Sequence, residues 1–247
     1  AGGRGRGIGA FWRLPNNLFV DPHARRPLEN PTDGRTIRAD TTPTVSGPAP
    51  EDAAPMPAEP IIRLLTEADI PRLAEIRPGF VSDTALRVER LGKGLEAGWR
   101  LVEYPLPGPF DKGHAYDFDA NEQAAIRRRL RRGDGLHLVV EWRGRIAGLL
   151  EVTPQEWNNT AWVWNLMLDR AIRRQGIGRE LFGRAVAWAR QAGYRALVFE
   201  TQTNNVPACK FYLALGCRLD GLRETLYHND DLARGEVALF WTYLLVQ

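Results

Sequence analysis

The sequence predicts an α/β fold with a mixed, mostly antiparallel sheet flanked by helices. Three strand-like segments follow one another between Leu136 and Leu168 with only short turns between them, which is typical of an antiparallel meander. After this meander, strand patterns alternate with amphipathic helix patterns. The chain has 247 residues, 44% of them hydrophobic, so it has room for one substantial domain with a buried core.

The first part of the chain has a different composition. Residues 1–60 contain ten of the 17 prolines and show no apolar periodicity. Such a segment buries too little apolar surface to offset the entropy lost on ordering. We therefore expect residues 1–58 to be a disordered tail rich in Pro, Gly and Arg, and residues 59–247 to form the folded domain. The Gly3–Gly9 run lacks both the Lys-Ser/Thr ending of a phosphate loop and the strand that precedes one.

The folded part begins at Ile61. Thr66 is a candidate N-cap, with Asp69 three residues later, for a helix that ends near Arg77. The predicted elements before the meander are a strand over Ile61–Leu64, this helix, strands over Thr84–Glu89 and Trp99–Tyr104, and a helix over Asn121–Arg132. The last helix bears a basic cluster, Arg127–Arg132. We favour a solvated helix face for it, with anion or nucleic-acid contact as the alternative.

The meander consists of strands over Leu136–Trp142, Ile146–Val152 and Ala161–Leu168. The next segment, Gly178–Gln191, is predicted as a helix ended by Gly193, because its apolar residues fall on one stripe: Leu181, Phe182, Ala185, Val186, Trp188 and Ala189. The remaining predicted elements are a strand over Ala196–Thr201, a helix over Val206–Leu215 closed by Gly216, and strands over Leu222–Tyr227 and Val237–Leu245.

Composition excludes several classes of function. A formal charge of +3 is too small to indicate nucleic-acid binding by itself. Cys209 and Cys217 are the only cysteines, and the four histidines lack ligand spacing, so we expect neither a disulfide framework nor a metal site. No apolar run reaches the ~18 residues of a membrane span, and the N-terminus lacks the apolar stretch of a signal peptide. We therefore expect a cytoplasmic protein without a membrane partner.

The most informative segment runs from Leu166 to Arg179. A strand leads into a loop with two glycines and several basic or amide side chains, and the loop leads directly into an amphipathic helix. The free N–H groups and the positive end of such a helix favour phosphate, and glycines let the backbone close around an anion. The segment therefore predicts a diphosphate-binding loop. It lacks the third glycine of a dinucleotide fold, since Leu181 stands there, and it lacks the Lys-Ser/Thr of a triphosphate loop.

This segment resembles the acyl-CoA signature of the GNAT superfamily of N-acetyltransferases. The R-x-x-G-x-G positions are occupied by Arg173, Gly176 and Gly178. A second family pattern, N-x-x-A-x-x-x-Y-x-x-x-G, is reproduced by Asn205, Ala208, Tyr212 and Gly216. Two motifs in the right order are far more specific than either alone. The runs Glu200–Asn205 and Ala208–Tyr212 are similar to streptothricin acetyltransferases in particular, and the resemblance covers residues 59–247.

The resemblance implies a cofactor, acetyl-CoA, and a set of residues that bind it. The central strand pair should splay so that the pantetheine arm inserts between Leu166–Leu168 and Ala196–Thr201, with main-chain bonds to Leu166 and Leu168. An N–H near Leu166 or Met167 would polarise the thioester carbonyl. The pyrophosphate would be held by Arg173, Arg174, Gln175, Gly176, Ile177, Gly178 and Arg179. Asn205 would bond the pantetheine arm, and Tyr212 would protonate the departing thiolate rather than act as a core tyrosine.

The acceptor must be an uncharged amine, so a base has to remove its proton. Many relatives have an acidic residue on the strand before the loop, but Trp164 and Asn165 stand at the position of an acidic pair in this chain. We place both on the substrate side, and we take Glu200 as the replacement base, with a structural carboxylate as the alternative. Glu151 and Asp169 are weaker candidates. For Trp162 and Trp164 we favour core packing over substrate stacking.

Three functions remain open. The first is acetylation of a small-molecule amine such as an aminated antibiotic, which would confer resistance. The second is acetylation of protein N-termini or lysines, with a peptide as acceptor. The acceptor groove, mostly residues 78–120, separates these two, and its acidic residues would suit a polycation: Glu103, Asp111, Asp117 and Asp119. The third, a nucleic-acid-binding protein that uses the Gly/Arg tail and Arg127–Arg132, leaves two acyl-CoA motifs unexplained. A homodimer is compatible with all three.

Overall fold

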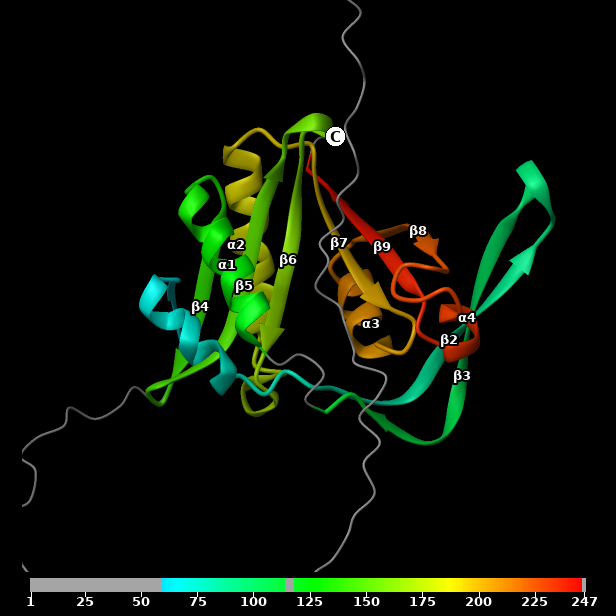
Figure 1. Ribbon diagram of the computed structural model, residues 1–247, viewed down its shortest axis with the longest axis horizontal. Helices are drawn as coiled ribbons and strands as arrows, with labels where there is room; N and C mark the ends of the chain where they lie inside the picture. The colour runs from blue at the N-terminus through cyan, green and yellow to red at the C-terminus, as the bar shows by residue number, and fades with distance from the viewer. Residues whose placement is uncertain (1–58, 114–117, 246–247) are drawn as a thin grey trace, which may run out of the picture.

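The computed structural model describes residues 59–113 and 118–245, so the predicted tail over residues 1–58 lies outside the described residues. A seven-stranded sheet forms the centre of the molecule (Figure 1). Its strands are, in spatial order, β1 (Ile61–Leu64), β4 (Leu136–Trp142), β5 (Arg145–Gln155), β6 (Thr160–Leu168), β7 (Ala196–Gln202), β9 (Ala238–Leu244) and β8 (Arg218–Arg223). Every neighbouring pair is antiparallel except β6 and β7. The predicted mixed, mostly antiparallel sheet is therefore confirmed.

The parallel pair β6 and β7 is joined over only a short stretch. Three residue pairs connect the strands: Thr160 with Ala196, Ala161 with Leu197, and Trp162 with Val198. Beyond them the strands diverge, and Figure 1 shows the gap that widens between them. The expected splayed central pair is confirmed.

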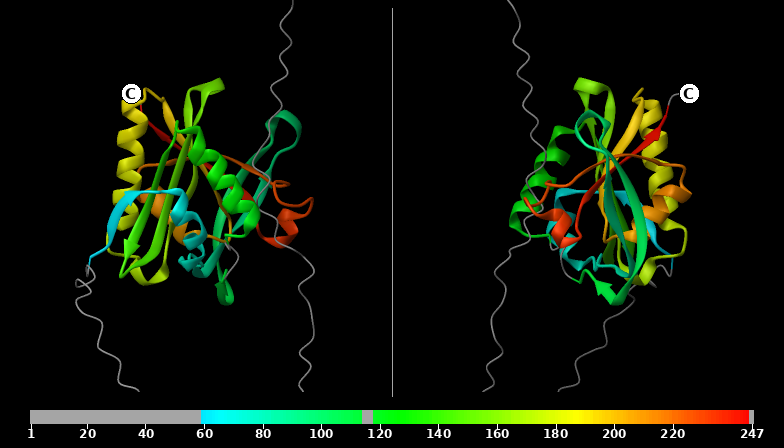
Figure 2. Two further views of the ribbon diagram at one scale, coloured as in Figure 1. Left: turned by 60° about the vertical axis from the view of Figure 1, so that its left-hand side comes forward. Right: turned by 90° about the vertical axis from the view of Figure 1, so that its right-hand side faces the viewer.

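Helices cover both faces of the sheet, as the two views of Figure 2 show. On one face, α2 (Ile177–Gln191) and α3 (Val206–Ala214) pack on alternate sheet residues such as Leu138 and Val140. On the other face, α1 (Ala120–Arg132) and a 3-10 helix (Glu67–Glu75) pack on residues of the opposite parity, such as Val139. Successive strand side chains point to opposite faces, so the continuous apolar run of β4 supplies both cores.

A hairpin of β2 (Val81–Leu91) and β3 (Gly98–Asp111) forms a separate two-stranded sheet that projects beside β8 and β9 (Figure 1). Its base is joined to the domain by a backbone hydrogen bond of 2.9 Å from the Leu86 N–H to the Thr203 carbonyl. Nearer to the turn between β2 and β3, Arg90 and Trp99 donate to the Glu224 carboxylate. The remaining short elements are α4 (Asp231–Arg234) and three single-turn 3-10 helices (Gly94–Glu96, Glu156–Asn158 and Arg170–Ile172).

Two sequence-based expectations need correction. The strand predicted over Leu222–Tyr227 is wrong, because β8 spans Arg218–Arg223 and a turn follows it. The Asp231 carboxylate accepts hydrogen bonds from the N–H groups of Tyr227 and His228, so a side chain takes the place of a strand partner there.

The helix predicted from Thr66 to Arg77 is a 3-10 helix that ends at Glu75 and contains Pro71. Proline removes one backbone donor and does not fit an α-helix interior, which accounts for the tighter form. The expected cap is present: the Asp69 carboxylate accepts from the Thr66 N–H at 2.9 Å. None of the helices in the described ranges is long and apolar enough to cross a membrane.

Candidate active site

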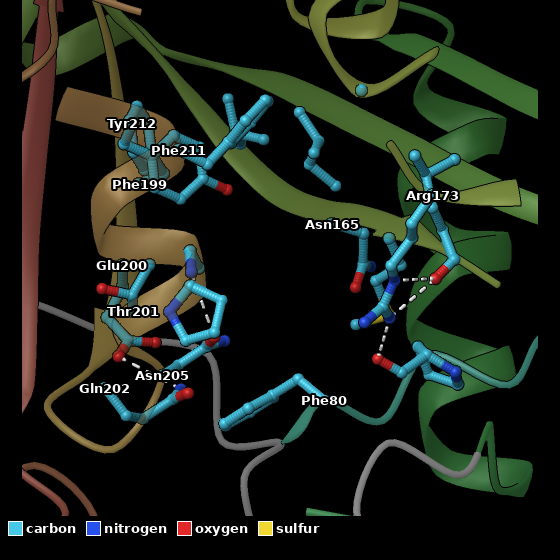
Figure 3. A pocket seen from close by; sticks show the side chains of 18 of the residues that line it. Phe80, Asn165, Arg173, Phe199, Glu200, Thr201, Gln202, Asn205, Phe211 and Tyr212 are labelled. Atoms are coloured by element: carbon cyan, nitrogen blue, oxygen red, sulfur yellow. Dashed lines mark hydrogen bonds between the residues drawn. The ribbon is translucent and has the colours of Figure 1, made fainter. Parts of the chain in front are cut away.

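A cavity of about 1420 Å³ occupies the gap between β6 and β7 (Figure 3). Most of the predicted site residues line it: Trp164, Asn165, Leu166, Met167, Leu168, Arg173, Arg174, Gly176, Gly178, Arg179, Glu200, Asn205 and Tyr212. Gln175 and Ile177 do not. Gln175 is exposed and donates to the Ala171 carbonyl at 3.4 Å, and Ile177 is buried in the core beneath the loop. Residues from separate elements, such as Asn165 of β6 and Glu200 of β7, thus face one space.

The main chain of β6 presents polar groups to this gap. The Asp169 N–H donates to the Ala147 carbonyl at 2.8 Å, in register with the pairing of Leu168 with Gly148. Hydrogen-bonded pairs alternate along an antiparallel ladder, so the main-chain groups of Met167 point to β5 and those of Leu166 and Leu168 point away from it. Since β7 pairs with β6 only up to Trp162, these groups face the cavity.

The glycine loop and the start of α2 form one end of the cavity. Gly176 is the N-cap of α2 and has φ of 85°, a left-handed conformation that glycine adopts without cost. A Cβ built there would meet nothing within 4 Å, so the loop surface is open. The first N–H groups of a helix have no intrahelical partner, and they carry its positive end. In the described part of the chain, the exposed side chains of Arg174 and Arg179 form no ion pair.

Arg173 has a different position from its two neighbours. Its guanidinium donates to the Leu168 carbonyl at 3.0 Å from Nε and 2.8 Å from Nη2, and Nη2 also donates to the Pro78 carbonyl. These contacts tie the loop to the end of β6 and to the segment before β2, as the dashed lines in Figure 3 show. The side chain therefore fixes the loop to the main chain at Leu168 and Pro78.

Helix α3 supplies the opposite wall. The Asn205 oxygen accepts from the Ala208 N–H at 3.2 Å as the N-cap of the helix, and the same side chain lines the cavity. Tyr212 is 8% exposed and packs on the ring of Phe199, with centroids 4.2 Å apart. The aromatic neighbours hold the Tyr212 ring in one position at the cavity wall.

Glu200 lies on β7 across the gap from β6. Its carboxylate accepts from the Tyr227 hydroxyl and from the Gln202 amide, the latter at 3.4 Å. Burial raises the pKa of Glu200 to about 8, although the hydrogen bond from Tyr227 acts in the opposite direction. Burial, together with the nearby Glu200 charge, also raises the pKa of Tyr227. Glu200 is thus a carboxyl group whose proton affinity suits exchange with an amine near neutral pH.

The hairpin and α1 close the other end of the cavity. Five residues of the hairpin and six of α1 or its N-cap contribute: Val81, Ser82, Asp83, Thr84, Glu103, Asp119, Asn121, Glu122, Ala124, Arg128 and Arg129. Two of the four acids expected in an acceptor groove, Glu103 and Asp119, are in place, but Glu103 pairs with Lys210 at 2.7 Å. Asp111 pairs instead with Arg170 outside the cavity, and Asp117 lies outside the described residues.

Trp162 and Trp164 are half-buried and line the cavity, so the favoured core packing is only part of their role. The Trp164 indole donates to the Thr153 hydroxyl at 2.7 Å, and the Arg129 guanidinium lies 4.5 Å from its ring centroid. One face of Trp164 is therefore covered by protein.

The two weaker base candidates have structural partners. Asp169 accepts from the N–H groups of Ala171 and Arg77 and caps the turn after β6. Glu151 is fully buried beside Arg129. Neither carboxylate lines the cavity.

The basic cluster on α1 is largely neutralised. Arg127 and Arg131 pair with Glu67, Arg129 pairs with Glu122 and Glu151, and Arg132 pairs with Asp134. This arrangement favours the solvated or paired helix face over a nucleic-acid surface. Among residues 59–113 and 118–245, no three His, Cys, Asp or Glu side chains gather into a possible metal site.

Two partners of the site residues, Tyr227 and Arg129, are not indicated by local sequence patterns. Tyr227 lies in a turn where the sequence predicts a strand, and no local pattern indicates that it reaches Glu200. Arg129 belongs to a cluster interpreted as a solvated face. A lone carboxylate at Glu151 in the otherwise apolar run Ile146–Val152 was the available signal that a buried cation lies nearby.

Comparison with known proteins supports the resemblance to the GNAT acetyltransferases. The model of the acetyltransferase (GNAT) family matches residues 99–217. A streptothricin acetyltransferase from Streptomyces lavendulae is 32% identical over 163 residues, which are 65% of this chain and 82% of that protein.

Two solved structures are similar in fold. Nourseothricin acetyltransferase has a TM-score of 0.63 and 26% identity, over 76% of this chain and 99% of its own. A Bacillus anthracis protein described as a streptothricin acetyltransferase, in complex with acetyl coenzyme A, has a TM-score of 0.59 and 24% identity, over 76% and 98%. The two acyl-CoA motifs, the splayed sheet and these relatives agree, and the chain belongs to the GNAT family of acetyltransferases.

Proposed function

We propose that the chain acetylates a primary amine of a small molecule such as a streptothricin-type antibiotic, by direct attack on acetyl-CoA in a ternary complex. Acetyl-CoA is the donor, as in the family to which the chain belongs. One observation supports the proposal most: a single cavity runs through the β6–β7 gap from the Gly176 loop to Glu200. A donor and an acceptor can therefore meet in line between the strands.

Glu200 accepts the proton of the amine. An ammonium group has no lone pair, and an amine of the lysine type has a pKa of ~10.4, so a base is needed before attack. With its pKa raised to about 8, Glu200 binds a proton far more readily than an ordinary carboxylate. The Tyr227 hydroxyl holds the carboxylate in place.

Leu166 and Tyr212 act on the thioester oxygen and on the leaving sulfur of the donor. The Leu166 N–H faces the gap and would donate to the thioester oxygen as negative charge develops on it, whereas the Met167 N–H points to β5. Tyr212 would give its hydroxyl proton to the sulfur that leaves when the tetrahedral intermediate collapses. Its aromatic neighbours keep the hydroxyl at the cavity wall.

The loop end holds the charged part of the donor. Arg174, Arg179 and the N–H groups from Gly176 to Gly178 offer donors and positive charge for a diphosphate, with Gln175 and Ile177 contributing through their main chain. Asn205 presents its amide N–H to the pantetheine arm while its oxygen caps α3. We assign Arg173 to loop fixation, since its donors already bind carbonyl groups.

Streptothricin is our proposed acceptor class because a streptothricin acetyltransferase at 32% identity is matched over 82% of its length. The test is release of free thiol from acetyl-CoA with a panel of streptothricin, aminoglycosides, polyamines and lysine-containing peptides. We expect turnover with streptothricin and an acetylated amine in the product by mass spectrometry. Turnover with peptides alone would make the chain a protein acetyltransferase, and no turnover with any amine would refute the proposal.

We also propose that the protein forms a homodimer and is located in the cytoplasm. Size-exclusion chromatography of the same preparation tests the oligomeric state, and cell fractionation tests the location.

A further inference from the structure

The β5 strand carries a buried carboxylate for which the proposed reaction has no direct use. Glu151 is 0% exposed and lies directly opposite Asn165 in the β5–β6 pairing. Oε1 accepts from Arg129 Nε at 2.6 Å, and Oε2 accepts from Arg129 Nη2 at 2.9 Å and from Asn165 Nδ2 at 2.8 Å. His137 Nδ1 lies 3.5 Å from Oε1. A fully buried carboxylate is costly unless it is paired in this way.

These partners keep Glu151 ionised. Burial opposes its charge, but the contacts with His137, Arg129 and Asn165 together hold its pKa below the usual range. An ionised carboxylate is an acceptor only. It therefore admits only the donor end of the Asn165 amide, because the Asn165 oxygen would repel Oε2. The orientation of an asparagine amide is usually settled by such a network, and here the carboxylate settles it.

The consequence appears in the cavity. Asn165 is 7% exposed and lines the gap, and its oxygen accepts no hydrogen bond from the described part of the chain. Figure 3 shows its side chain directed into the space between β6 and β7, with Glu200 on the other side. A neutral amide oxygen accepts an N–H and stabilises the ammonium form much less than a carboxylate at the same place would, because it carries no net charge. It can thus hold an amine while opposing its deprotonation less than a carboxylate would.

We propose that Glu151 is a positioning residue, which locks the Asn165 amide so that its oxygen receives an N–H of the acceptor amine opposite Glu200. The assignment rests on the proposed function. Arg129 completes the arrangement, because its guanidinium binds Glu151 and covers the Trp164 ring. The chain thus presents a neutral acceptor where an acidic side chain would bind the ammonium too well.

The test uses the full chain with streptothricin and acetyl-CoA. Asn165→Leu removes the amide oxygen and leaves the Arg129–Glu151 pair in place. Glu151→Gln replaces one of the two carboxylate oxygens by an N–H₂ group, which in either orientation faces a donor of Arg129, so the network no longer fixes the orientation of the Asn165 amide. We expect each variant to lower kcat/KM for the acceptor roughly 10-fold, the worth of one hydrogen bond, while the acetyl-CoA dissociation constant stays unchanged.

The double variant distinguishes positioning from general stabilisation. If Glu151 acts through Asn165, Glu151→Gln has no further effect on acceptor kcat/KM in the Asn165→Leu background. Additive losses, or an Asn165→Leu enzyme with wild-type acceptor kinetics, would overturn the inference. Glu151→Asp, which keeps the charge for Arg129 but withdraws it from Asn165, replaces Glu151→Gln if circular dichroism shows that the latter does not fold.

Glu141→Gln is the matched control. Glu141 lies on β4, the neighbour of β5, and does not line the cavity. Its carboxylate pairs with Arg63 of β1 at 2.9 Å. Its substitution should leave acceptor kinetics unchanged. Failure of the proposed function would look different: the wild-type protein itself would acetylate no amine. An active wild type with an unaffected Asn165→Leu variant refutes the positioning role alone.

Discussion

The Tyr227 hydroxyl donates a hydrogen bond to Oε1 of Glu200, although the two residues lie 27 positions apart and belong to different elements. Glu200 is in β7, and Tyr227 is in the turn after β8 that Asp231 holds through two N–H groups. The turn thus fixes a hydroxyl against a half-buried carboxyl group at the cavity. Anything that moves this turn should change the proton affinity of the proposed base.

The first prediction concerns the pH dependence of acetylation. Because the pKa of Glu200 is raised to about 8, the basic form accumulates as the pH rises, and kcat/KM for the amine should climb through this range. Glu200→Gln should lower kcat about 10²–10⁴-fold, the usual contribution of a general base. Steady-state kinetics from pH 6 upward measure both effects.

Two further variants should move this profile in opposite directions. Tyr227→Phe removes a hydrogen bond that lowers the pKa of Glu200, so the rise should shift to higher pH. Glu236→Gln removes a nearby negative charge that raises it, so the rise should shift to lower pH. Shifts of the same sign in both variants would show that another group controls the profile.

The same burial predicts a loss of stability at high pH. In the unfolded chain Glu200 releases its proton near its ordinary pKa of ~4.3, whereas in the folded chain it keeps the proton until about pH 8. The folded state therefore binds more protons between these values, and stability falls as the pH rises through this window. Glu200→Gln should flatten this part of the melting-temperature profile, with Glu141→Gln as the control.

Tyr212→Phe tests the leaving-group step. The substitution keeps the ring that packs on Phe199 and removes only the hydroxyl. We expect kcat to fall by about 10²-fold, the lower end for a general acid, because a coenzyme A thiol leaves fairly easily. The acetyl-CoA dissociation constant should stay near the wild-type value. Tyr243→Phe, which alters another tyrosine of the same aromatic cluster away from the cavity, should change neither quantity.

Gly176→Val tests the diphosphate loop. A Cβ at Gly176 enters open space in the cavity, so the substitution should weaken acetyl-CoA binding by filling the place of the ligand. It also strains a backbone with φ of 85°. Gly193→Val is the matched control, since Gly193 has φ of 78° and also has open space around it, at the far end of α2. Equal effects of the two variants on acetyl-CoA affinity, measured by calorimetry, would place the phosphate site elsewhere.

Arg173 and Arg174 should respond differently to the same substitution. Arg173→Met removes the donors that tie the loop to Leu168 and Pro78, so it should lower the melting temperature of the protein without ligand. Arg174→Met should leave that temperature unchanged and should weaken acetyl-CoA binding in a salt-dependent way. If Arg174→Met leaves the affinity intact, the positive end of α2 is sufficient for the diphosphate.

Much of the fold is predictable because local patterns agree with it. The strand over Leu136–Trp142 has the predicted bounds, and the helices before Gly193 and Gly216 end within one residue of their predicted limits. The apolar stripe of α2 and the glycine stop act over a few residues, so a single sequence contains them. The strand predicted over Leu222–Tyr227 failed because its outcome depends on Asp231, whose carboxylate binds the turn.

The site was predictable to the extent that motifs lie in continuous segments. The loop around Gly176 and the helix start at Asn205 are local, and both line the cavity. Tyr227 binds Glu200 and Glu151 binds Asn165. The turn after β8 brings Tyr227 to Glu200, and the pairing of β5 with β6 brings Glu151 to Asn165. Such contacts between separate elements leave no periodic pattern in the sequence.

Among the described residues, three residue pairs between β6 and β7 are the only strand pairing that joins the two halves of the sheet. On either side of these pairs the sheet has its own antiparallel ladders, and α2 packs against both β6 and β7. A donor molecule bonded to the free main chain of Leu166 and also to Asn205 would act as a bridge between the halves. Amide hydrogen exchange in this part of β6 should then slow when the donor binds, and the two halves should open together as one cooperative unit.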